Sequence, residues 1–239
     1  MPLRIHVQRG GRKLGVTLAP HLDEWTEANP LVAALHSGDV GWHLRNTDEA
    51  LESAFTVWSA DQTTVAIGMA DGRVLRTAFA PDWLHSAALA AAIARELEGI
   101  EYVEAPCGAV LRSRLLLGGW SADPDPLVLL YKELTSTDAE HEDTEMYAVS
   151  GTDDVEARVA VQRSAFAPGS TFQPELWERM TAGPSYDARF ELLARTPTGE
   201  PAAAATGWFA GPGRCAILEP VGTHRDHQRT AMGVASRWP

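Results

Sequence analysis

The sequence predicts an α/β protein of two domains, each with a mixed sheet of the α+β kind. Short β-branched and aromatic runs alternate with segments that carry apolar residues at helical spacing. Apolar residues make up 45% of the 239 residues, which is enough for one large core or two small ones. A polar, acidic stretch at 135–145 separates two apolar segments. We therefore expect one domain at 1–135, a linker at 136–145 and a second domain at 146–239.

The first half changes from strand to helix periodicity near Ala80. Asp71-Gly72 predicts a hairpin turn, because glycine tolerates the positive φ that such turns need. Leu89, Ile93 and Leu97 recur every four residues, which is helical spacing. The expected elements are strands at 55–58, 64–69 and 73–79, a helix within 80–99, a strand at 100–105, a helix at 108–117 and a buried strand at 126–134. Residues 1–50 carry no readable pattern.

The second half predicts a strand, two helices and a three-stranded meander. Pro168-Gly169 ends the first helix, and Pro174 suits the first turn of the second. The turn-rich segments 196–200 and 211–213 predict hairpins between the last three strands. The expected elements are a strand at 146–150, helices at 154–166 and 175–180, and strands at 188–195, 202–209 and 214–221.

Charge and composition exclude several classes of protein. The formal charge of −12 repels nucleic-acid phosphates, so we expect no nucleic-acid partner. This negative charge suits a cationic amine substrate, although the need for solubility alone also explains the charge. No run of about 18 apolar residues and no long apolar leader is present, so we expect no membrane contact and a cytoplasmic location. Cys107 and Cys215 are too few for a disulfide framework. His224, Asp226 and His227 lack a fourth ligand, so no metal is predicted.

The last predicted strand runs into an unusual segment, residues 218–233. Pro220 lacks an N–H and Gly222 permits unusual backbone angles, which fits a strand that breaks away from its ladder. The chain continues as Gln228-Arg229-Thr230-Ala231-Met232-Gly233. If a helix begins here, its first N–H groups have no intrahelical partner and, with the helix dipole, favour a phosphate. An ordinary loop is the alternative.

This segment resembles the acyl-CoA-binding segment of the GNAT superfamily of N-acyltransferases. The family pattern is a strand, a splayed turn and then Gln/Arg-x-x-Gly-x-Gly/Ala at the start of a helix. Gln228, Ala231 and Gly233 occupy its three marked positions, with Ala231 in place of the first glycine. The preceding strand, two helices and meander also look like the family, so the resemblance covers about residues 146–233.

The resemblance implies an acetyl-CoA-dependent N-acetyltransferase that acts on a primary amine of a small molecule or peptide, with a homodimer as one option. Glu219 would be the catalytic base, and a desolvated carboxyl there would have a raised pKa. A solvated or structurally paired glutamate is the alternative. The residues implied to bind acetyl-CoA are Val221, Gly222, Thr223, Gln228, Arg229, Thr230, Ala231, Met232 and Gly233. A catalytically inactive GNAT-like binding protein is the second hypothesis.

The first half resembles a degenerate second copy in a tandem arrangement, with a different α/β domain as the alternative. Its segment 80–86 lacks Gly-x-Gly, and Asp82 and Trp83 oppose a pyrophosphate by charge and volume. Few residues follow Thr223. We therefore expect the second copy to be truncated, without the later strands or a general acid, and with its last strand as an exposed edge.

Overall fold

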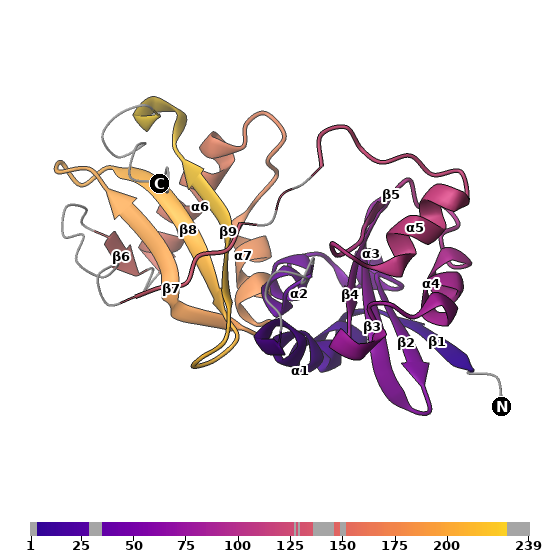
Figure 1. Cartoon of the computed structure of the whole chain (residues 1–239). Coiled ribbons are helices and arrows are strands. Elements are labelled where there is room, and N and C mark those ends of the chain that lie inside the picture. The colour runs from indigo at the N-terminus through magenta and orange to yellow at the C-terminus, as the bar shows by residue number, and fades with distance from the viewer. Residues whose placement is uncertain are drawn as a thin grey trace.

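The computed structural model describes residues 4–28, 35–126, 128, 130–135, 146–148 and 152–228. In these residues the chain forms two sheets (Figure 1). A five-stranded sheet belongs to the N-terminal half, residues 4–126, and a four-stranded sheet belongs to the C-terminal half, residues 146–228. The predicted division into two folded parts therefore coincides with two separate sheets, while the expected linker at 136–145 lies outside the described residues.

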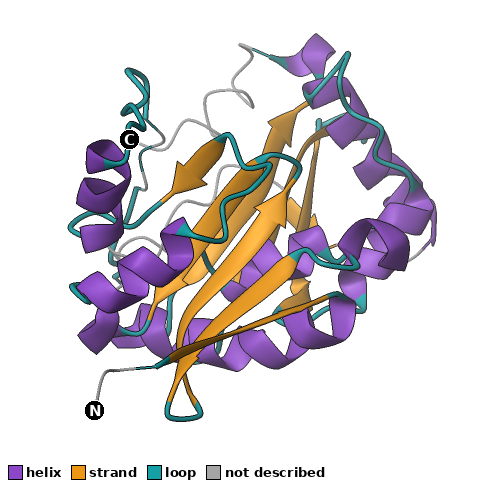
Figure 2. Ribbon diagram, turned by 90° about the vertical axis from the view of Figure 1, so that its right-hand side faces the viewer, coloured by secondary structure: helices purple, strands orange, loops and turns teal. Residues whose placement is uncertain are grey.

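The N-terminal half is a mixed sheet with helices on both faces (Figure 2). Its strands lie in the order β1-β2-β3-β4-β5, antiparallel except for the parallel pair β4–β5. Its elements are β1 (Ile5–Gly10), α1 (Arg12–Ala28), α2 (Ser37–His43), α3 (Asp48–Leu51), β2 (Phe55–Ala60), β3 (Thr63–Asp71), β4 (Val74–Phe79), α4 (Ala87–Ala94), β5 (Tyr102–Glu104) and α5 (Val110–Leu117). The predicted strands between 55 and 105 and the predicted helix at 108–117 are confirmed. None of the described helices is both long and apolar enough to cross a membrane.

Two cores form because successive side chains of a strand point to opposite faces of the sheet. On β2, Phe55 and Val57 pack under α1 and α2, whereas Trp58 and Ala60 pack under α4 and α5. The expected long helix within 80–99 is divided: Pro81–Trp83 form a 3-10 turn, and α4 begins after Ser86. The side chain of Ser86 accepts the backbone N–H of Leu89 and so caps the start of α4.

The C-terminal half confirms the predicted meander. Its elements are β6 (Met146–Ala148), α6 (Thr152–Ala165), α7 (Pro174–Thr181), β7 (Tyr186–Arg195), β8 (Pro201–Phe209), β9 (Ala216–Thr223) and the 3-10 turn η4 (Arg225–His227). The sheet order is β6-β7-β8-β9, with every pair antiparallel. The order of strand, helices, meander and 3-10 turn repeats that of the N-terminal half from β1 to Pro81–Trp83. Among the described residues, no strand pairs with the outer edge of β9.

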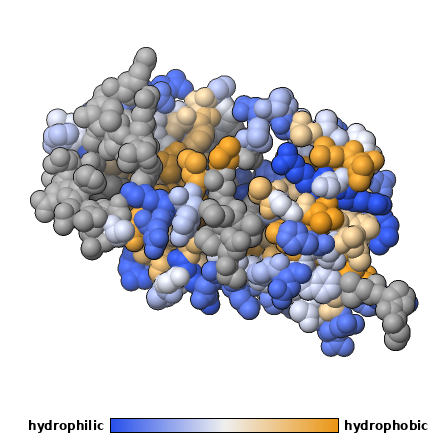
Figure 3. Space-filling view, in the orientation of Figure 1, coloured by the Kyte–Doolittle hydropathy of each residue, from blue (hydrophilic) through white to orange (hydrophobic). Residues whose placement is uncertain are grey.

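The prediction of a buried strand at 126–134 is wrong for the described part of that segment. Residues 128 and 130–135 have no regular structure, and the side chains of Val128, Leu130 and Leu134 are 72%, 87% and 70% exposed. A strand needs a neighbouring strand for its backbone hydrogen bonds, and an apolar run does not specify that neighbour. Apolar surface also remains over α5 (Figure 3), where the Leu117 side chain is exposed.

The two halves meet where α2 packs against β8 and β9, and Figure 1 shows α2 between the sheets. Trp208 of β8 is fully buried there, directly against Gly38 and Gly41 of α2. A Cβ atom at Gly38 would lie 2.3 Å from Cβ of Trp208, and one at Gly41 would lie 2.5 Å from its Cζ3 atom. Glycine is therefore the residue that allows this close approach. The hydroxyl of Ser185 also donates to that of Ser37 at 2.7 Å.

We predict that Gly38→Ala destabilises the protein by about 1–3 kcal/mol, because the added methyl group overpacks the contact with Trp208. The direction is informative, since alanine stabilises an ordinary helical position by up to about 1 kcal/mol relative to glycine. The control for an added methyl group is Gly169→Ala, in the turn after α6, where the nearest atom to an added Cβ is the Phe166 carbonyl oxygen at 3.9 Å. Urea unfolding measures both variants. Equal stabilities for the two variants would contradict the proposed close fit.

Candidate functional site

Glu219 lies at an irregularity of the outer strand β9. Leu218 pairs with Gly207 and Val221 pairs with Ala205, so Glu219 and Pro220 together oppose Thr206 as a β-bulge. The indole Nε1 of Trp208 donates a hydrogen bond to the Glu219 carbonyl oxygen at 2.6 Å. A proline is tolerated at this place because an edge strand with a bulge does not need every N–H for its ladder. The bulge thus fixes Glu219 beside the junction of the two halves.

The carboxyl group of Glu219 faces groups from the N-terminal half. The side chain of Asp39 on α2 lies within hydrogen-bonding reach of it, and the guanidinium groups of Arg76 and Arg45 act on it electrostatically. Asp39 is only 2% exposed. Its Oδ2 accepts the backbone N–H of His36 at 2.6 Å, and its Oδ1 accepts Nη1 of Arg76 at 2.7 Å. Nε of Arg76 in turn donates to Glu104 of β5 at 2.8 Å.

This environment raises the pKa of Glu219 to about 7. Burial is the largest cause, because it disfavours the charged form. The negative charge of Asp39 and the hydrogen bond with it add to the rise, while Arg76 and Arg45 oppose it. The direction agrees with the expectation from the sequence. A carboxyl group that titrates near neutral pH can both take up and release a proton under physiological conditions.

The residues predicted to bind acetyl-CoA are only partly described. Val221 is exposed on β9, and Gly222 and Thr223 are half-buried on the same strand. Gly222 does not have the unusual backbone angles that were expected, since its φ is not positive. Its glycine is instead required by packing, because a Cβ there would lie 2.7 Å from Cβ of Ala165 at the end of α6.

The predicted pyrophosphate loop stays a prediction. Gln228 follows η4, and its side-chain amide lies 3.5 Å from the carbonyl oxygen of Thr223. The other members of the motif lie outside the described residues: Arg229, Thr230, Ala231, Met232 and Gly233. The structure thus brings Gln228 back towards the end of β9 and does not test the helix start that was expected after it.

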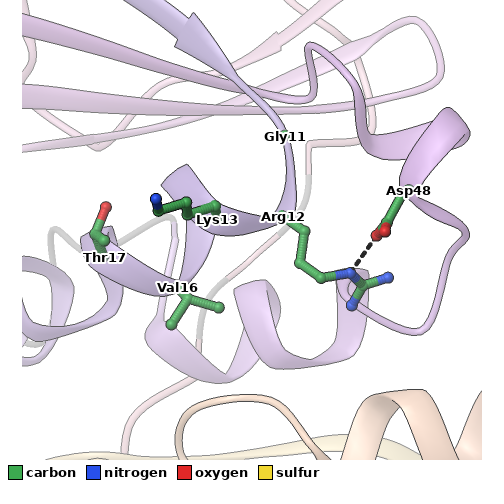
Figure 4. Close-up of a pocket in the computed structure, with 6 residues that line it drawn as sticks. All are labelled: Gly11, Arg12, Lys13, Val16, Thr17 and Asp48. Atoms are coloured by element: carbon green, nitrogen blue, oxygen red, sulfur yellow. Dashed lines mark hydrogen bonds and ion pairs between the residues drawn. The ribbon is translucent and has the colours of Figure 1, made fainter.

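A separate hollow of about 580 Å³ opens at the start of α1 (Figure 4). It is lined by Gly11, Arg12, Lys13, Val16, Thr17 and Asp48. The guanidinium of Arg12 is committed to Asp48 and to the carbonyl oxygens of Leu44 and Asn46, so it serves to hold α1 on the chain before α3. The hollow contains none of the predicted site residues, and we place the candidate site at Glu219.

Asp39, Arg45 and Arg76 were missed by the sequence reasoning. The first two fall in residues 1–50, where no element could be predicted. A local signal was nevertheless present at His36 and Asp39, whose spacing of three residues is that of a capping box, and the structure shows both of its hydrogen bonds. Arg76 places a charged residue in the mostly apolar strand β4, which is a second usable signal.

We predict that Glu219→Gln stabilises the fold above pH 7 and has little effect near pH 4.5. Between pH 4.5 and 7 the unfolded chain releases the Glu219 proton while the folded state still holds it, so the free energy of unfolding falls as the pH rises through this range and is then constant. The free energy of unfolding of Glu219→Gln relative to wild type should rise between pH 4.5 and 7 and should be higher by roughly 1–3 kcal/mol at pH 8. Urea unfolding at pH 4.5 and 8 measures it. Glu200→Gln, on an exposed turn, is the control, and the same pH dependence in that variant would refute the assignment.

Comparison with known proteins finds resemblance at the level of structure. No protein-family profile matches the chain, and no curated protein matches it. A GCN5-related N-acetyltransferase from Sphaerobacter thermophilus superposes on 98% of this chain and 81% of its own, with a TM-score of 0.50 and 15% identity. A tandem GNAT protein from the clavulanic acid biosynthesis pathway, solved without acetyl-CoA, covers 96% of this chain and 82% of its own, with a TM-score of 0.45 and 14% identity. The first comparison shows that the chain has a GNAT-like α/β fold.

Proposed function

We propose that this protein transfers an acetyl group from acetyl-CoA to a primary amine of a small molecule or peptide. The observation that carries the proposal is the half-buried carboxyl group of Glu219 on the outer strand β9 of a GNAT-like fold, where burial raises its pKa to about 7. The acetyltransferase name of the Sphaerobacter protein supports the reaction class. The tandem relation of the two halves is part of the proposal and is supported by their repeated order of elements.

The chemistry requires a proton acceptor. A primary amine with a pKa near that of lysine is almost entirely protonated at neutral pH and cannot attack a thioester in that form. The Glu219 carboxylate would take this proton directly or through one water molecule. The amine nitrogen then forms a bond to the acyl carbon, the carbon–sulfur bond of the thioester breaks, and coenzyme A leaves as a thiolate. The attacking nitrogen loses a proton to solvent and the thiolate takes one up, which gives the amide and the free thiol.

The outer edge of β9 is the proposed place for the extended arm of acetyl-CoA. Among the described residues no strand occupies this edge, and the exposed Val221 lies on it two residues after Glu219. An extended ligand with amide groups can pair with such an edge as another strand would. Gln228 and the residues up to Gly233 are proposed to hold the pyrophosphate. The net charge of −12 favours the approach of a cationic amine.

We expect the protein to bind acetyl-CoA in calorimetry and to release free thiol with at least one member of a primary-amine panel. Glu219→Gln should lower kcat by about 10²–10⁴-fold and leave acetyl-CoA binding in place, because the base acts on the amine. Glu200→Gln, which removes an equal charge from a surface turn, should retain the wild-type rate.

The outcomes separate the two hypotheses for the function. No heat at millimolar acetyl-CoA from a folded sample would remove the acetyltransferase proposal. Binding without transfer to any amine would favour the catalytically inactive binding protein. An unchanged kcat in Glu219→Gln would show that another group removes the proton.

A further inference from the structure

The carboxyl group of Glu219 comes from the C-terminal half, but the charged groups that face it come from the N-terminal half. Asp39 belongs to α2, Arg45 follows α2, and Arg76 belongs to β4. Behind these groups, Glu104 of β5 is bonded to Arg76, and Asp71 at the end of β3 acts on Arg45. The surroundings of the proposed base are therefore supplied by the half of the chain that does not carry the base itself.

Asp39 is held rigidly at this junction. Its hydrogen bond from the backbone N–H of His36 belongs to the capping box of α2, and the Arg76 guanidinium fixes its other oxygen. The helix itself is seated by the contact of Gly38 with Trp208 of β8, the strand that pairs with β9. Nε2 of His36 also lies 3.2 Å from the carbonyl oxygen of Cys215, immediately before β9. The position of Asp39 relative to Glu219 is thus determined by backbone packing on both sides.

We propose that Asp39 is a positioning residue for Glu219: its carboxylate holds the Glu219 carboxyl by a shared proton, so that the proton-accepting site is assembled from both halves of the chain. The role in acetyl transfer rests on the function proposed above. The existence of the carboxyl pair does not depend on that function, and the pair can be measured even if the protein has no activity.

The distribution of hydrogen bonds places the shared proton on Glu219. Two carboxyl groups can hydrogen-bond to each other only when one of them carries a proton. Both oxygens of Asp39 already accept hydrogen bonds, from a backbone N–H and from a guanidinium group. Each donor points its hydrogen at an oxygen of Asp39, so the shared proton is bonded to Glu219, which donates it to Asp39. When Glu219 gives up this proton, Arg76 and Arg45 remain to balance the two adjacent negative charges.

The test follows the titration of Glu219 by NMR in protein labelled with ¹³C at the glutamate carboxyl carbons. The resonance of Glu219 is assigned by its loss in Glu219→Gln. In the wild-type protein the midpoint is expected near pH 7. In Asp39→Asn it should fall by about one pH unit or more, because the like charge is lost while both arginines stay. Asparagine keeps an oxygen for the cap, which favours folding of the variant.

Glu104→Gln is the matched control. It removes an equal charge from the same guanidinium of Arg76, but Glu104 is not among the groups that act on Glu219. Its effect on the Glu219 midpoint should be less than half of that in Asp39→Asn. An unchanged midpoint in Asp39→Asn, or an equal shift in both variants, would overturn the proposal.

A second measurement applies if Asp39→Asn does not fold. In wild-type protein labelled at the aspartate carboxyl carbons, the Asp39 resonance should move at the midpoint of Glu219, and this step should vanish in Glu219→Gln. If the Asp39 resonance still moves at this pH in Glu219→Gln, the proposed carboxyl pair is wrong. If acetyl transfer is detected, the pH–rate profile of Asp39→Asn should shift to lower pH with the NMR midpoint. A shifted midpoint without any transfer would retain the pair and remove only the proposed function.

Discussion

The arrangement of the candidate site depends on the contact between α2 and Trp208. Gly38 and Gly41 bring the helix backbone against the indole ring, and the same indole donates its N–H to the carbonyl oxygen of Glu219. One buried side chain therefore locates both the helix that carries Asp39 and the strand that carries Glu219. Neither half alone contains the complete set of charges around Glu219.

The C-terminal half also contains a buried carboxylate that has a different role. Glu191 and Arg158 are almost fully buried and form an ion pair, and Thr206 and Gln162 complete their hydrogen bonds. A buried pair whose bonds are satisfied within the core serves packing, and removing one partner would leave an uncompensated charge. Glu219 differs because it lies on the outer strand, partly exposed, with the opposing charges on another layer of the fold. A raised pKa indicates a functional site only where such access exists.

Much of the fold could be predicted from the sequence, because strong local signals determine it. Asp71-Gly72 forms the expected turn with a positive φ at Gly72, and Leu89 and Ile93 are buried as their spacing predicted. The segment 126–134 was mispredicted because its apolar side chains carry no information on which strand could pair with them. Glu219 could be proposed from the family resemblance and its place on the last predicted strand. Asp39 and Arg76 could not, because their proximity to Glu219 arises from contacts between segments far apart in the sequence. The role of Arg229 to Gly233 remains a prediction.

The bulge at Glu219 and Pro220 has a consequence for which changes of chain length the protein can accept. Side chains alternate between faces along a strand, so one residue gained or lost between Trp208 and Glu219 within the paired region would turn the carboxyl away from α2. The turn at Gly211 and Gly213, where both glycines have positive φ, lies outside the paired register. Insertions at this tip lengthen the hairpin without altering the pairing of Gly207 with Leu218. The hairpin tip can thus vary in length in related chains or engineered variants, while the ladder beside Trp208 cannot.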